Sequence, residues 1–249
     1  MKNVRMVFSL IALVSVMAAS QGFAITQIRD GGVHNISNLV NDTIWVDFES
    51  PGLRTTVNVL NGAEISGGDD LAGYNECTLN VSGGYIYHAV HHGLNGLLNI
   101  SGGTINQVNH HSAVTMSGGT VNTLYASNVY SASSMIMTGG HIGTLNDGIG
   151  SITISGGSVN NLDLDGGGAS QAGVVNIIGS DFAINGNPVD FGRYFRTDFS
   201  SGTLTGRLAN GDYLDTHFHI DGSASFTLIP EPATFCLFAL AGLFIRNKK

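Results

Sequence analysis

The middle of the chain repeats a short pattern of apolar and polar residues that ends in two glycines. In Leu97-Leu98-Asn99-Ile100-Ser101-Gly102-Gly103, apolar residues alternate with polar ones before the glycine pair. Such alternation is typical of a strand that buries one face. Copies of the pattern start at residues 56, 78, 97, 113, 134, 151 and 174, and the first and last copies are degenerate. Recurring units of this length predict stacked coils of chain.

A second strand should follow each glycine pair, because apolar residues recur two and five places after the second glycine. Glycine reaches positive φ without steric cost, so the pair predicts a change of direction. One unit cannot bury its apolar side chains alone, whereas stacked units share a core and pair their strands about 4.8 Å apart. We therefore predict an all-β fold over residues 25–186, a single-stranded parallel β-helix that is right-handed, with seven coils spanning about 34 Å.

The pattern changes after Gly186. Residues 187–229 contain three of the five arginines that lie between the two ends of the chain, and a turn sequence at Asn210-Gly211-Asp212. We expect this region to form a β-rich cap, because the last coil would otherwise present an open strand edge. The cap is rich in aromatic residues, namely Phe191, Tyr194, Phe195, Phe199, Tyr213 and Phe218.

Both ends of the chain have the composition of sorting segments. Residues 1–24 combine a basic start, an apolar run and small residues, as signal peptides do, and we expect cleavage after Ala24, with Ser20 as the alternative. At the other end, Pro230-Glu231-Pro232 precede a predicted membrane helix at 233–245. That helix is shorter than the roughly 20 residues of a stable span. The basic residues after it would stay cytoplasmic, leaving the chain before Pro230 on the far side of the membrane.

This tail closely resembles the PEP-CTERM sorting domain of bacterial exosortase substrates, which is also catalogued as an ice-binding protein C-terminal domain. The resemblance covers residues 230–249. It implies transient anchoring in the inner membrane, cleavage by an exosortase near Pro230, Glu231 and Pro232, and release to the cell surface or its polysaccharide matrix. It predicts destination and processing only, so the activity of the passenger, residues 25–229, must be inferred separately.

The passenger is strongly acidic. It contains no lysine, and its five arginines face 17 acidic residues, a formal charge of −12. Such a chain repels nucleic acid and anionic lipid, so we expect no nucleic-acid partner. Cys77 is its only cysteine, which excludes an intramolecular disulfide.

Candidate catalytic residues are few. A pectate-lyase-like site would need clustered carboxylates and a basic residue, yet no lysine or arginine occurs between Thr55 and Gly192. A glycosidase needs two carboxylates at a set separation, and Asp163 and Asp165 lie about 6.6 Å apart on one side of a predicted strand, with Asp147 about one coil away. The pair lies beside Gly166-Gly167-Gly168, so a solvated turn explains it better, and a calcium site is a further alternative. We therefore predict no catalytic residue.

Ice binding would require a regular threonine array, but the predicted outward column is mixed: Asn58, Asn80, Asn99, Thr115, Ile136, Thr153 and Asn176.

Histidines form the one unusual constellation. His91 and His110 both lie seven places after the second glycine of their units, and His92 and His111 lie eight places after it. Two adjacent coils would then bring four imidazoles together at one corner. This corner is either a polar, stacked corner or a metal site, for which imidazole is a common ligand.

Together these patterns favour an exported, exosortase-processed, non-catalytic protein, a structural or adhesive component of the cell surface or extracellular matrix. Its processing partners would be signal peptidase and an exosortase, and extracellular polysaccharide is a candidate binding partner. No cofactor is expected. The alternative is a β-helix polysaccharide lyase or glycoside hydrolase.

Overall fold

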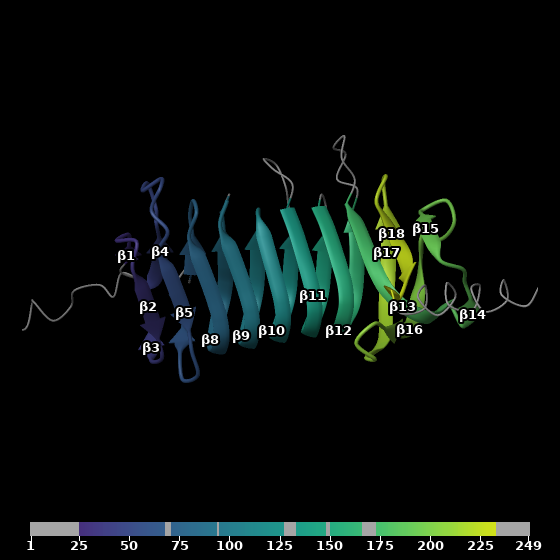
Figure 1. Ribbon diagram of the computed structural model, residues 1–249, viewed down its shortest axis with the longest axis horizontal. Helices are drawn as coiled ribbons and strands as arrows, with labels where there is room; N and C mark the ends of the chain where they lie inside the picture. Colours follow the sequence, from purple (N-terminus) through teal and green to yellow (C-terminus); the bar gives the residue numbers. More distant parts are fainter. Residues whose placement is uncertain are drawn as a thin grey trace, which may run out of the picture.

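The computed structural model describes residues 25–67, 71–93, 95–126, 133–147, 150–165 and 173–232, and there the chain is all-β with a long parallel-strand sheet. The strands lie side by side along one axis, from the N-terminal strands at one end to the C-terminal strands at the other (Figure 1). This arrangement is consistent with a β-helix-like fold. The first coils are built from short strands: β1 (Ile25–Ile28), β2 (Val33–Ile36), β3 (Leu39–Val40), β4 (Thr43–Val46), β5 (Thr56–Val59), β6 (Glu64–Ile65) and β7 (Leu71–Gly73).

In the middle of the molecule, one long strand makes each coil, and each pairs in parallel with the next. The glycine pairs therefore bend a continuous strand and do not separate two strands. These long strands are β8 (Thr78–His92), β9 (Leu97–His110), β10 (Ala113–Ala126), β11 (Ser133–Asp147) and β12 (Gly150–Asp165). The remaining strands are β13 (Val174–Ile184), β14 (Asn187–Pro188), β15 (Gly192–Phe195), β16 (Ser201–Leu208), β17 (Tyr213–Asp221) and β18 (Ser225–Pro230).

The register places equivalent apolar residues directly above one another inside the coil. The predicted core column is confirmed, since Val81, Ile100, Met116 and Ile154 are at most 1% exposed and are linked by successive strand pairings. A parallel column runs two residues earlier in each coil. Its members are Val57, Leu79, Leu98, Val114, Met135, Ile152, Val175 and Phe226, all buried. The core is thus continuous along the whole described coil.

Outside the coil, the predicted outward column is present and its first members hydrogen-bond to one another. The Nδ2 of Asn58 donates to Oδ1 of Asn35 at 2.7 Å, and that of Asn80 donates to Asn58 at 2.8 Å. Asn99 continues the series onto Asn80 at 2.8 Å, and the Thr115 hydroxyl donates to Asn99 at 2.6 Å. Each side chain therefore provides the hydrogen-bond acceptor for the side chain of the next coil. The resulting amide ladder links five coils on their outer face.

The C-terminal region closes the coil by supplying its last strands. β17 pairs in parallel with the end of β12, and β18 pairs in parallel with β13. The antiparallel strands β14, β15 and β16 then cover this end. This region is β-rich, as predicted, and two of its strands also continue the parallel stacking.

A hairpin turn fastens the cap to the last complete coil. Asp212 accepts a hydrogen bond from the backbone N–H of Gly157 at 2.6 Å and another from the side chain of Asn210 at 2.6 Å. The backbone N–H of Asn210 donates to Ser155 O at 3.0 Å. The turn thus lies against the glycine corner of β12, where the next coil would otherwise continue.

The N-terminal end is closed by polar residues at inward positions. His34 pairs with Val57 in the core column, and its Nε2 lies 2.9 Å from Asp30 Oδ1. Thr26 pairs with the buried Ile44, and its hydroxyl donates to Asp42 at 3.3 Å. These polar pairs lie at the N-terminal end of the apolar core within the described residues.

Within the described ranges, we find no helix that is long and apolar enough to cross a bilayer. The predicted signal peptide, residues 1–24, and the predicted membrane helix, 233–245, lie outside those ranges. Cys77 is fully buried, and this burial raises the pKa of its thiol to about 12.

Replacing Ile100 with Asp should destabilise the protein by several kcal/mol, because an unpaired carboxylate would enter a core column. Urea unfolding followed by circular dichroism would measure the loss. The matched control is Asn106→Asp in the same coil, since Asn106 is exposed and its side-chain oxygen already accepts a bond from Asn122. Equal stability of the two variants would contradict the assigned register.

Removing the Asp212 carboxylate should loosen the cap. Its hydrogen bonds, first from the Asn210 side chain and then from Gly157 N–H, lower the pKa of Asp212. A lowered pKa means that the stabilisation is present at neutral pH and is lost as the pH falls through the lowered value. Asp212→Ala should therefore lower the unfolding free energy by about 1 kcal/mol at pH 7. In chemical denaturation the difference from the wild type should shrink below about pH 4, and a difference that grew in acid would disprove this role.

Candidate functional site

The histidine corner has a different register from the predicted one. Backbone pairing places His92 beside His110 and His91 beside Asn109. The expected pairing of His91 with His110, and of His92 with His111, is therefore wrong. The cause is a register shift between Ile86 and Ala89 of β8, where β8 has one more residue than β9. Such a bulge offsets every later residue by one position.

This correction changes what the corner can offer a metal. Adjacent coils bring together one histidine pair, His92 and His110, and not the predicted four residues at matched positions. His111 follows the end of β9 in the connection to β10. The side chains of His91, His92 and His110 are outside the described set. Among the side chains that are described, no group of three or more potential ligands could hold a metal ion.

The candidate carboxylates lie on the outer surface of the last complete coil. Asp163 and Asp165 occupy the same side of β12, and Asp165 is exposed. Asp163 pairs with Asn146 of β11 and with His219 of β17, whereas Asp147 pairs with Leu164. Asp147 is thus displaced by one residue from the column of Asp163. The side chain of Asp147 and the nearby Gly166, Gly167 and Gly168 fall outside the described residues.

A shallow groove of about 380 Å³ surrounds Asp163 where the cap joins the coil. Asp163 Oδ1 lies 3.2 Å from Nδ1 of His219, and Nδ1 of His217 lies 3.2 Å from the Thr203 hydroxyl. The other residues that line the groove are Thr144, Asn161, Leu162 and Phe218. Both members of the Asp163 and His219 pair are about half exposed, so water screens their interaction.

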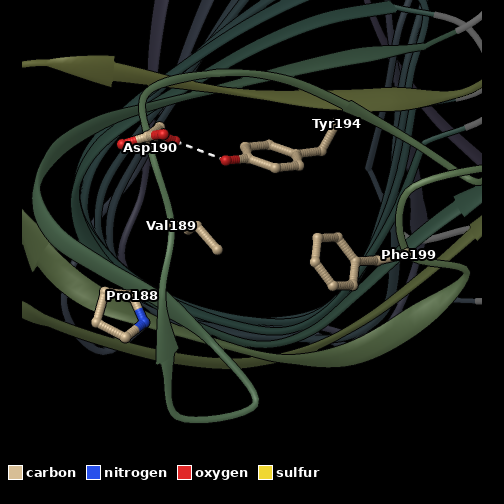
Figure 2. A pocket seen from close by; sticks show the side chains of 5 residues that line it. All are labelled: Pro188, Val189, Asp190, Tyr194 and Phe199. Atoms are coloured by element: carbon tan, nitrogen blue, oxygen red, sulfur yellow. Dashed lines mark hydrogen bonds between the residues drawn. The ribbon is translucent and has the colours of Figure 1, made fainter.

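A second pocket of about 350 Å³, the end pocket, lies at the C-terminal end of the coil. It is lined by Pro188, Val189, Asp190, Tyr194 and Phe199. Figure 2 shows the rings of Tyr194 and Phe199 on one side of the open space and the segment with Val189 on the other. The lining therefore combines apolar side chains with polar atoms, and Asp190 is the acidic residue in it.

The end pocket lies where the core column ends. Tyr194 pairs with Phe226, the last member of the buried column, and the two rings stack with centroids 5.4 Å apart. The Tyr194 hydroxyl donates to the backbone oxygen of Asp190 at 2.7 Å, as the dashed line in Figure 2 shows. Partial burial, followed by the nearby carboxylates of Asp190 and Asp198, raises the pKa of Tyr194, so the phenol remains a donor.

The arginines next to the end pocket are engaged elsewhere. Arg193 Nε donates to the Ser225 hydroxyl at 2.8 Å, and its guanidinium lies 4.8 Å from the ring centroid of Phe195. Arg196 pairs with Asp221 at 3.0 Å. No basic residue is among those that line the pocket. Asp221 neutralises Arg196, and the two carboxylates of Asp190 and Asp198 outnumber the remaining charge of Arg193, so these described charges sum to a negative value.

Sequence reasoning placed Tyr194 and Phe199 in the cap but did not find the pocket. Their role depends on β15 running antiparallel to β18, and β18 lies more than 30 residues later in the chain. No local spacing indicates that pairing.

Comparison with protein-family models, curated proteins and solved structures gave no match for this chain.

We predict that any zinc bound at the histidine corner depends on His92 and His110. Two imidazoles are half of the usual four ligands of a structural zinc site, so binding should be weak. Calorimetric titration with zinc at pH 7.5 should show that His92→Ala/His110→Ala abolishes binding while His91→Ala retains it. Zinc binding that survived in His92→Ala/His110→Ala but was lost in His91→Ala would show that His92 and His110 are not the ligands. His141→Ala is a suitable control, because His141 bonds Ser158 on a different part of the coil.

Proposed function

We propose that this chain is an exported, exosortase-processed protein that acts as a structural or adhesive component of the cell surface or extracellular polysaccharide matrix, without catalytic activity. The observation that carries the proposal is the position of the last strand. β18 ends at Pro230, the first residue of the Pro-Glu-Pro motif. Cleavage near this motif would leave every described strand in the mature protein.

The first described strand supports the same processing scheme. β1 (Ile25–Ile28) lies after the preferred signal-peptidase site at Ala24, so cleavage there would leave this strand in the mature protein. The two proposed cleavage sites thus lie on either side of the described strands. We also propose that the coil is right-handed and that residues 233–245 hold the precursor in the inner membrane until an exosortase acts.

The construction of the body supports a structural role. Most of its buried side chains pack between stacked coils. On its outer face, asparagine side chains of successive coils hydrogen-bond to one another and so link the coils. A continuous core with nearest-neighbour contacts gives an extended, stiff surface whose length is set by the number of coils. Such a body suits a spacer or an adhesive surface exposed outside the cell.

The groove around Asp163 and His219 supports the alternative, a polysaccharide-modifying enzyme. It combines a carboxylate, two imidazoles and neutral hydrogen-bonding groups on one surface. A lyase or glycosidase would lose most of its activity in Asp163→Asn. A non-catalytic component would bind or assemble equally well with either residue, so this single variant separates the two functions.

Processing predicts the two ends of the mature protein. Intact-mass spectrometry of protein recovered from the surface of the native host should give an N-terminus at Ile25 and a C-terminus near Pro230. Glu231→Ala/Pro232→Ala should retain the tail, because these residues follow β18 and form the motif. Asn187→Ala, an exposed change in the cap, is the control. Surface protein that still ended at Lys249 would refute exosortase processing.

A further inference from the structure

We propose that the end pocket binds a sugar ring that carries a protonated amine, as an amino sugar of a glycan does. This inference rests on the proposed location of the protein outside the cell and assigns a ligand class to its adhesive role. Its three grounds are the size of the pocket, its aromatic walls and its local charge.

The size of the end pocket suits one ring. Its volume of about 350 Å³ lies near the lower limit of small-molecule sites, which span about 300–1,000 Å³. An ammonium group alone would fill a small part of this space, and an extended oligosaccharide would exceed it. The walls formed by Pro188, Val189, Tyr194 and Phe199 offer apolar surface to the carbon-bound hydrogens of a ring (Figure 2).

The aromatic walls are held in place before any ligand arrives. Tyr194 is fixed by its stacking on Phe226 and by its bond to the Asp190 backbone, and Phe199 lies 6.0 Å from it with the ring planes tilted by 45°. Two inclined rings attract a cation that comes within about 6 Å of their faces. Because the rings are already ordered, little conformational entropy is lost on binding.

The charge around the pocket selects a cationic ligand. Asp190 lines the pocket, and both Asp190 and Asp198 are close enough to act electrostatically on Tyr194. Asp198 is held in place because its Oδ2 accepts a bond from Phe195 N–H at 2.9 Å. Arg196 is paired with Asp221, and the single charge of Arg193, which is held by Ser225 and Phe195, is smaller than that of the two carboxylates. A protonated amine is therefore attracted, and an acidic sugar is repelled.

Titration calorimetry of the full chain would test the ligand class. The probes are glucosamine, N-acetylglucosamine, glucose, glucuronic acid and lysine amide. Glucosamine should bind about tenfold more tightly than its two neutral counterparts, a preference of the size that an aromatic cation site supplies. Glucuronic acid should not bind, and salt should weaken the binding of glucosamine. Equal affinity for lysine amide would show that a protein side chain or the chain's own basic tail is the ligand, and would overturn the assignment to a sugar.

The matched variant is Asp190→Asn. It removes the charge with little change in shape, and it keeps the hydrogen bond from Tyr194 because that bond ends on the backbone oxygen. The variant should reduce the preference for glucosamine, because the carboxylate is lost while the two rings remain. Asp215→Asn, an exposed change on β17 outside the pocket, should keep it. An unchanged preference in Asp190→Asn, or no binding of any sugar by the wild type, would disprove the site.

A second variant tests the aromatic wall. Phe199→Leu keeps an apolar side chain against the core but removes the ring, so affinity for every sugar probe should fall while the unfolding midpoint remains close to that of the wild type. These experiments measure binding only. They can therefore fail while the mass-spectrometric test of processing succeeds, and the reverse also holds.

Discussion

The close contact between successive coils at their glycine corners is the constraint on which the rest of the structure depends. The second glycine of each pair has positive φ, for example 74° at Gly103. A Cβ at Gly103 would lie 2.5 Å from the backbone oxygen of Gly83 in the preceding coil, closer than side chains tolerate. Because the backbones meet here without side chains between them, the strands on either side of the corner can continue their parallel pairing. The core columns and the amide ladder both follow from that pairing.

Parallel stacking leaves the two ends of the coil unequal, and the protein closes them differently. At the N-terminal end, His34 takes an inward position and is paired with Asp30, while Ile36 keeps the neighbouring core column apolar. At the C-terminal end, the chain reverses direction and covers the opening with antiparallel strands. The hydrogen bond from His34 lowers the pKa of Asp30, so this contact weakens when acid protonates the carboxylate. Among the residues that the structure describes, the N-terminal closure is therefore the simpler of the two.

Much of the coil could be predicted from the sequence, because it depends on local alternation. The apolar column through Ile100 and the polar column through Asn99 lie where the pattern placed them. The histidine register was predicted wrongly and the parallel pairing of β18 was not predicted, and both have physical causes. The bulge in β8 adds a residue that no motif marks, and it moved His91 away from His110. The cap strand β18 joins the parallel stack through pairing with β13, which is distant in sequence and has a different local pattern. Registers that depend on such remote contacts cannot be derived from spacing.

The same division separates the parts of the protein that are committed to stacking from those that are available for recognition. Each coil must match its neighbours on both sides, so its inward residues and its glycines have little freedom to change. The cap matches a neighbour on one side only. Tyr194 and Phe199 therefore combine contact with the end of the core and partial exposure to solvent. Because a repeating coil presents similar surfaces along its length, the place where the repetition stops is where a distinct, concave site can form.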